Sequence, residues 1–208
     1  QYALSRRMQS GGANQTDYKV ERCVIWFSDV VNFSHYTLKA TPERVADIVQ
    51  RFFNAQSGPI LSAGGHIDKF IGDGLMAFWI VPGDDASAAE QCGAALEAAQ
   101  QAALSVSEIQ IGQIALSLRI GLHIGPVVSG DFGSATRHQF TLIGPEVNKA
   151  ARLEQVHSDD VVEGQGTLGE IRLSREFWKQ LSASQQAACP NPFVVRAKNI
   201  GRTDILTN

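Results

Sequence analysis

Two aspartates at predicted strand ends could together hold a divalent cation. Asp73 lies in the stretch Lys69-Phe70-Ile71-Gly72-Asp73-Gly74, and Asp29 follows the apolar run Cys23 to Phe27. Carboxylate oxygens are ligands that hard cations such as Mg²⁺ prefer. If the two strand ends are neighbours, the sequence predicts a metal site between them. Lys69 would place an ammonium group beside that metal, and this combination suits the binding of a nucleotide.

The segment around Asp73 is predicted to form a β-hairpin. Residues 66–71 alternate into Asp73-Gly74, and residues 75–80 lead out of it. An Asp-Gly pair between two such runs is typical of a two-residue type I′ turn. Gly74 supplies the positive φ that this turn needs and Asp tolerates it, so a purely structural role for Asp73 stays open.

A second group of polar side chains lies on a helix predicted to begin at Pro145. Asn148 and Arg152 are four residues apart and therefore share one face of that helix. A guanidinium can neutralise developing oxyanion charge, and an amide can orient a sugar hydroxyl, so the pair suits a phosphoryl centre. The alternative is an ordinary exposed face on which Arg152 pairs with nearby glutamates.

The elements that must position these groups can be predicted from the pattern. The pattern of apolar residues and helix caps predicts a strand at about 20–29 and a helix with Thr41 as N-cap and Pro42 at its first position. It also predicts an Ala-rich helix from Asp85 to about Leu104. Each helix has an apolar face that should pack on a sheet. The face of the second helix consists of Ala88, Cys92, Ala95, Leu96 and Ala99.

Residues 116–124 alternate, which predicts a long strand with one buried face that Gly125-Pro126 bends or ends. A strand at 139–143 and a helix from Pro145 to about Val156 follow. The order β-α-β-β-α-β predicts an α+β fold, a ferredoxin-like core whose antiparallel-rich sheet is covered by helices. Additional C-terminal elements are predicted as a strand near 170–173, a helix near 175–181, and strands near 193–197 and 203–206.

Composition favours one domain and argues against a nucleic-acid partner. The chain has 208 residues, 44% hydrophobic and 19% charged, with a net charge of −3 and no basic run, which argues against a nucleic-acid partner. Cys23, Cys92 and Cys189 are odd in number and lie in apolar contexts, which indicates reduced thiols and a cytoplasmic location. Residues 1–18 are polar and predict a linker from an upstream regulatory region, so the domain itself spans 19–208.

Four segments, taken together and in this order, resemble the catalytic domain of the class III nucleotidyl cyclases, most closely a bacterial adenylate cyclase. The segments are Phe27-Ser28-Asp29-Val30-Val31-Asn32-Phe33-Ser34, Asp68 to Phe78, Gly121 to Gly130, and Gln139 to Leu153.

The resemblance implies a role for each matching residue. Asp29, Asp73 and the carbonyl of Val30 would hold two Mg²⁺ or Mn²⁺ ions at each active site. Lys69 and Thr141 occupy the positions that contact the purine, where guanylate cyclases typically carry Glu and Cys, so the implied substrate is ATP.

The resemblance also implies a transition-state pair and an oligomer. Asn148 would orient the ribose and Arg152 would stabilise charge on the α-phosphate, while Lys198 would approach the β- and γ-phosphates. In the family the site forms between chains, so a head-to-tail homodimer is implied, with the metal aspartates and Lys69 from one protomer and Thr141, Asn148 and Arg152 from the other.

Some positions depart from the family pattern. Asn32 replaces a common glycine, and Asn is the next best residue for a left-handed backbone. Pro145-Glu146 and Lys149 replace the more frequent Asp-Thr and Leu, which places charges beside the catalytic helix. None of these changes removes a catalytic group.

Other interpretations stand beside an adenylate cyclase that makes 3′,5′-cyclic AMP and pyrophosphate. A silent nucleotide-sensing module and a guanylate cyclase both stay open. Gly164-Gln165-Gly166-Thr167-Leu168-Gly169 fits a dinucleotide-binding pattern but precedes a strand rather than opening a helix, so we reject it. His66 and His123 are predicted to be strand residues with satisfied hydrogen bonds rather than metal ligands.

Overall fold

The computed structural model describes residues 18–38, 40–132 and 139–208, so the predicted linker, apart from Tyr18, lies outside the described residues. The first part of the chain forms β1 (Lys19–Val30), α2 (Phe33–Thr37), α3 (Pro42–Ser62), β2 (His66–Ile71), β3 (Gly74–Val81), α4 (Asp85–Ser107), β4 (Gln110–Ile111), β5 (Ile114–Ala115), β6 (Leu118–Asp131), β7 (Phe140–Ile143) and α5 (Pro145–Glu154). The second part forms a 3₁₀ turn (Ser158–Asp160), β8 (Val161–Glu163), β9 (Ile171–Ser174), α6 (Arg175–Trp178), α7 (Ala183–Ala188), β10 (Asn191–Ala197) and β11 (Gly201–Thr207).

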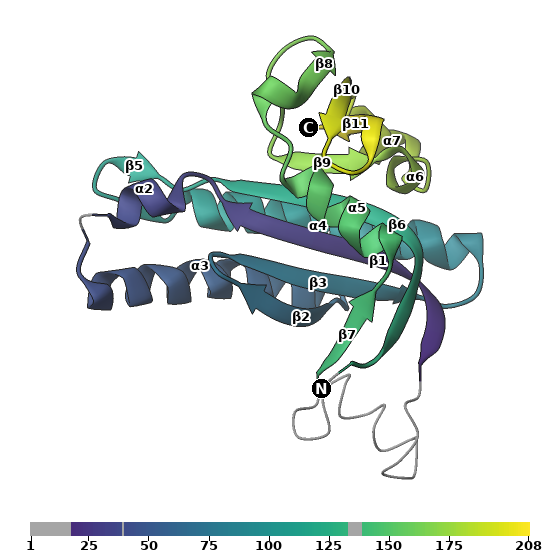
Figure 1. Cartoon of the computed structure of the whole chain (residues 1–208), viewed down its shortest axis with the longest axis horizontal. Coiled ribbons are helices and arrows are strands. Elements are labelled where there is room, and N and C mark those ends of the chain that lie inside the picture. The colour runs from purple at the N-terminus through teal and green to yellow at the C-terminus, as the bar shows by residue number, and fades with distance from the viewer. Residues whose placement is uncertain (1–17, 39, 133–138) are drawn as a thin grey trace.

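One sheet runs through the described part of the chain (Figure 1). Its strand order is β2-β3-β1-β6-β9-β11-β10-β8, and β7 pairs with the far end of β6. The first four strands are antiparallel, with β1 between β3 and β6, as the ferredoxin-like arrangement requires. The α+β prediction is confirmed, and the parallel pairing of β6 with β9 joins the C-terminal strands to the core.

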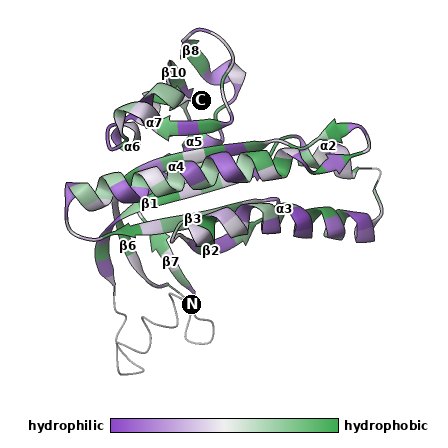
Figure 2. Cartoon of the chain, turned by 180° about the vertical axis from the view of Figure 1, so that it is seen from behind, coloured by the Kyte–Doolittle hydropathy of each residue, from purple (hydrophilic) through white to green (hydrophobic). Residues whose placement is uncertain are grey.

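Helices α3 and α4 cover one face of this sheet, as Figure 2 shows from behind. The predicted start of α3 is confirmed, because Pro42 is its first residue and the Thr41 hydroxyl accepts the Arg44 N–H at 3.4 Å. The apolar stripe predicted for α4 is confirmed as well, since all five of its residues are fully buried or nearly so. The largest buried side chains on this face are Trp26, Trp79 and Phe52.

The opposite face of β6 carries α5, which the sequence analysis did not anticipate. The prediction of one buried face was wrong, because the odd-numbered residues of the strand are covered too: His123 is 0% exposed and Gly121 is buried. A Cβ on Gly121 would lie 2.6 Å from both the Ala150 carbonyl oxygen and the Glu154 nitrogen. The backbone of α5 therefore rests directly on β6 at a position that only glycine permits.

Gly125-Pro126 does not end the strand, which was one of the two predicted outcomes, since β6 continues through both residues to Asp131. Pro126 pairs with Arg22 of β1 on one side. On the other side, β9 contacts residues 120–122 and β7 contacts residues 128–131, so neither strand reaches it. A proline is tolerated there because no strand on that side requires its missing N–H.

The hairpin between β2 and β3 is confirmed, but its turn lies one residue earlier than predicted. Ile71 pairs with Gly74, so the two-residue loop is Gly72-Asp73. Gly72 has φ +62°, whereas Asp73 is not among the described residues with positive φ. This combination belongs to a type II′ turn, which needs glycine at its first position, rather than to the predicted type I′ turn.

Asn32 adopts the left-handed backbone expected of it, with φ 58° and ψ 24°. Its carbonyl oxygen accepts the N–H groups of His35 and Tyr36, which begins the short helix α2 directly after β1. The chain therefore turns sharply within three residues of Asp29.

The contact between α5 and β6 gives a stability prediction. Gly121→Ala should lower the free energy of unfolding by about 1–3 kcal/mol, because backbone atoms of α5 must move to admit the methyl group. Chemical denaturation measures this change.

The matched control is Gly58→Ala in the exposed interior of α3, where nothing lies within 4 Å of the added Cβ. It should raise stability by roughly 0.5–1 kcal/mol through helix propensity. Equal effects of the two substitutions on stability would contradict the close packing of the α5 backbone against Gly121.

Candidate active site

The structure brings Asp29 and Asp73 together. Ser28 of β1 pairs with Leu75 of β3, which sets the hairpin turn beside the end of β1. A Cβ on Gly74 would lie 2.3 Å from the Ser28 carbonyl oxygen, so glycine is required for this approach. Burial first, and then the negative charge of Asp29, raise the pKa of the Asp73 carboxyl above its ordinary value.

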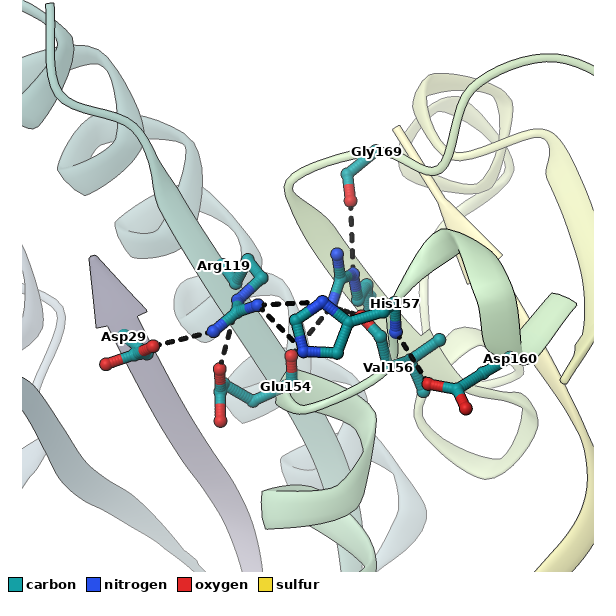
Figure 3. Close-up of polar contacts among 8 residues, drawn as sticks. Asp29, Arg119, Glu154, Val156, His157, Asp160 and Gly169 are labelled. Carbon is teal, nitrogen blue, oxygen red and sulfur yellow. Dashed lines mark hydrogen bonds and ion pairs between the residues drawn. The ribbon is translucent and has the colours of Figure 1, made fainter. Parts of the chain in front are cut away.

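Arg119 holds Asp29 in place. The two residues are direct partners in the β1–β6 ladder, and Nη2 of Arg119 lies 2.7 Å from Oδ2 of Asp29. The same guanidinium lies 3.3 Å through Nε from Oε1 of Glu154 and 3.3 Å through Nη1 from the His157 ring (Figure 3). Arg119 thus links β1, β6 and the C-terminal end of α5 around one charge.

Glu154 is the most perturbed carboxyl of this cluster. Its burial, together with the charges of Asp29 and Asp73, raises its pKa to about 7, although Arg119 and Arg172 oppose the shift. Arg172 itself is buried and donates Nη1 to the carbonyl oxygens of Glu154 and Val156, both at 2.6 Å. The C-terminal end of α5 is therefore capped by a buried cation from β9.

The donor set fits a hard divalent cation. Two carboxylates repel each other here, and Arg119 contacts only one of them, so a further positive charge would be favourable. The described residues contain no group of three or more His, Cys, Asp or Glu side chains that could hold a metal by themselves. Two carboxylates are sufficient for Mg²⁺, because this ion commonly binds one or two carboxylates and completes its coordination shell with water and phosphate oxygens.

A separate polar cluster joins β2 to β7. Nζ of Lys69 donates to Oγ1 of Thr141 at 2.9 Å, and the Thr141 hydroxyl donates to Oδ2 of Asp68 at 2.5 Å. The register of β2 shifts between Ile67 and Lys69. This bulge lets two consecutive side chains reach the same partner, which a regular strand would not allow.

This contact corrects one expectation. The family resemblance implied that Lys69 and Thr141 come from different protomers, whereas here they form a hydrogen bond within one chain. That division between protomers is therefore wrong for this pair. Asp68, whose pKa is raised by burial, is a third member of the cluster that the sequence analysis missed.

Asn148 and Arg152 lie on α5, as predicted, with Gly144 as N-cap and Pro145 at the first position. Asn148 is exposed, and Nη1 of Arg152 donates to Oε1 of Gln155 at 2.5 Å rather than to a glutamate. Among the described residues, no hydrogen bond or ion pair joins either side chain to Asp29 or Asp73. Within one chain, the Asn/Arg pair is therefore not bonded to the two aspartates.

The remaining two predicted residues lie in different surroundings. Val30 is buried at the end of β1, next to Asp29. Lys198 is exposed in the loop between β10 and β11, where Asn199 has φ 65°. Among the described residues, no hydrogen bond or ion pair joins Lys198 to another predicted site residue.

Sequence analysis missed Arg119 and Glu154 as members of the cluster. A signal existed for Arg119, since a cation in the middle of an alternating strand must face either solvent or an opposite charge. Its partner could not be found without the β1–β6 register, which places it opposite Asp29.

This fold and cluster agree with what comparison with known proteins finds. The sequence model of the adenylate and guanylate cyclase catalytic domain matches residues 16–207, so the chain belongs to that family. The resemblance drawn from the four segments is confirmed.

Two curated relatives and one solved structure show which family members this chain is similar to. The chain is 32% identical over 136 residues to Adenylate cyclase 1 of Rhizobium meliloti, which covers 64% of this chain and 20% of that protein. It is 31% identical over 140 residues to an adenylate cyclase of Anabaena cylindrica, which covers 64% and 27%. A bacterial light-regulated adenylyl cyclase superimposes with a TM-score of 0.70 at 25% identity, covering 91% of each chain.

The chain spans about a fifth to a quarter of the length of these two curated relatives. Within the part that the structure describes, none of the helices combines the length and apolar character needed to span a bilayer.

The raised pKa of Glu154 predicts how stability depends on pH. Between the ordinary pKa of 4.5 and about 7, the folded protein binds more protons at this group than the unfolded chain does. Its contribution to stability is therefore largest at low pH and is lost as the pH rises through this window, by at most about 1.4 kcal/mol per pH unit. Glu154→Gln should flatten the fall in unfolding free energy between pH 5 and 8.

The measurement is urea denaturation across that pH range in the presence of a chelator, so that no cation contributes. Glu163→Gln is the control, because Glu163 is exposed and pairs with Arg202 away from the cluster. If the unfolding free energies of Glu154→Gln and the parent depend on pH in the same way, the raised pKa of Glu154 is contradicted.

Proposed function

We propose that this domain converts ATP to 3′,5′-cyclic AMP and pyrophosphate, by in-line attack of the ribose 3′-oxygen on the α-phosphorus. The observation that carries the proposal is the convergence of Asp29 and Asp73 from β1 and the β2–β3 turn. The family membership and the adenylate cyclases among the relatives support it.

The two aspartates, with the carbonyl of Val30, would hold two Mg²⁺ or Mn²⁺ ions. When bound, such ions lower the cost of ionising the 3′-hydroxyl and gather the triphosphate. The chain's own contribution is to keep two like charges close together on a rigid strand and a tight turn. Arg119 offsets part of that repulsion while the carboxylates remain available.

The Asn/Arg pair of α5 would act on the reacting atoms from a second chain. Asn148 would orient the ribose, and Arg152 would stabilise charge that develops on the α-phosphate. Because these side chains and the metal aspartates do not meet within one chain, a head-to-tail homodimer would supply both sets to each site. Lys198 would approach the β- and γ-phosphates.

Base selection would fall to Lys69 and Thr141. Adenine presents an acceptor at N1 and a donor at N6, which the Lys69 ammonium and the Thr141 oxygen can satisfy. The hydrogen bond between these two side chains holds them at one place, and Asp68 orients the Thr141 hydroxyl. Since the relatives are longer than this chain, we also propose that a further region of the full protein regulates the domain.

The first test concerns the metal aspartates. Asp29→Asn and Asp73→Asn should each lower cyclic AMP formation from MnATP or MgATP at least about 100-fold, because each removes charge that holds the cations. Product is identified by chromatography across a protein dilution series, in which the specific activity of the parent should fall as the dimer dissociates.

Asp85→Asn is the matched control, since Asp85 of α4 forms an exposed ion pair with Arg22, and it should stay within about twofold of the parent. A parent that makes no cyclic nucleotide from either ATP or GTP at high concentration would overturn the proposal in favour of a silent nucleotide-binding module.

The second test concerns the base. Lys69→Glu combined with Thr141→Cys should move the ratio of ATP to GTP turnover toward GTP by about tenfold or more, because a carboxylate accepts from the guanine N1–H where an ammonium cannot. Turnover of the two nucleotides in direct competition measures the ratio. Lys179→Glu on the exposed surface should leave the ratio unchanged, and a parent that prefers GTP would make the domain a guanylate cyclase.

A further inference from the structure

The N-terminal turn of α5 is tied to β6 by a buried histidine. His123 is 0% exposed on the α5 side of β6, and its Nε2 forms a very short contact with Oε2 of Glu146 in the first turn of the helix. Glu146 also packs over Gly125, where a Cβ would lie 2.7 Å from its Cγ. The side chain of Glu146 therefore packs against two positions of β6, and only part of it is exposed.

The other nitrogen of His123 is bonded to the C-terminal region. Its Nδ1 lies 2.7 Å from Oγ of Ser174, the N-cap of α6, and that hydroxyl accepts the Phe177 N–H at 3.1 Å. Burial lowers the pKa of His123, which favours the neutral ring, although Glu146 opposes the shift. A neutral ring with its proton on Nε2 donates to Glu146 and accepts from Ser174, so every member of the chain is satisfied.

A second tie runs outside the first. Nζ of Lys149 lies 2.7 Å from Oε1 of Glu176, which joins α5 to α6 at the surface. Glu146 and Lys149 are the two charged residues that depart from the family pattern around Asn148. Both make contacts away from α5, and Glu146 makes its contact with a buried side chain.

We propose that His123 and Glu146 are positioning residues for α5, and that their hydrogen bond sets the angle at which the helix presents Asn148 and Arg152. This proposal rests on the function proposed above. Asn148 is two residues from Glu146 and Arg152 is six, so a tilt at the anchored turn displaces both. A displacement of about 1 Å at reacting groups can cost on the order of 100-fold in rate.

The test uses the full chain and five variants: Glu146→Ala, Glu146→Gln, His123→Ala, the double alanine variant, and Glu163→Ala as the matched control. Glu146→Ala should lower kcat by about 10- to 100-fold with KM for ATP within about threefold, because the helix acts on the reacting atoms. Glu146→Gln keeps an acceptor for Nε2 and should recover most of kcat. The double variant should be no worse than the poorer single one.

Hydrogen exchange supplies a readout that does not depend on activity. The amides of residues 148–152 should exchange faster in Glu146→Ala and unchanged in Glu163→Ala, whose ion pair with Arg202 lies between β8 and β11. Glu146 is partly exposed, so its variants carry the test even if His123→Ala fails to fold.

Two results separate the proposals. If the parent makes no cyclic nucleotide but exchange in α5 responds to Glu146→Ala, the positioning pair stands and the proposed function fails. If the parent is active while Glu146→Ala keeps kcat within twofold and leaves hydrogen exchange unaltered, the positioning role is overturned. It is also overturned if the loss of kcat in the double variant equals the product of the losses in Glu146→Ala and His123→Ala.

Discussion

The seating of α5 on β6 is the constraint on which the rest of the structure depends. Residues at alternate positions of β6 form this contact surface: Arg119, Gly121, His123 and Gly125. Arg119 contacts the last residue of the helix, Gly121 lies against residues 150–154, and His123 and Gly125 both contact Glu146 in the first turn. The strand therefore gains a second buried face that carries polar groups and glycine rather than the usual apolar residues.

That unusual composition explains which features could be predicted from the sequence. The spacing of apolar residues and the helix caps predict β1, α3, α4 and the β2–β3 hairpin. These signals are local, because a pair such as Thr41-Pro42 acts within one element. The cover over the odd face of β6 could not be predicted, because Arg119, Gly121 and His123 look like a solvent-facing row. Only the packing partner reveals that a glycine there admits a helix backbone.

In the candidate site, too, some features could be predicted from the sequence and others could not. Asp29 and Asp73 were identifiable by residue type and strand position, but the turn register was not, because Gly72-Asp73 and Asp73-Gly74 are both acceptable turn pairs. The choice is made by tertiary contact: Gly74 must lie in β3 against the Ser28 carbonyl, which moves the loop back by one residue. Likewise, the bulge that turns Asp68 and Lys69 toward Thr141 leaves no mark in the local sequence.

The balance of charge around Asp29 shows why the cluster suits a cation. Leaving a partly buried carboxylate unpaired is costly, and the β1–β6 register avoids this by placing Arg119 directly opposite Asp29. That single guanidinium is shared with Glu154, and it only partly opposes the rise in the pKa of Asp73, which is caused first by burial and then by the charge of Asp29. Arg119 therefore balances only part of the negative charge of Asp29, Asp73 and Glu154. The remaining deficit is what an incoming divalent cation would satisfy.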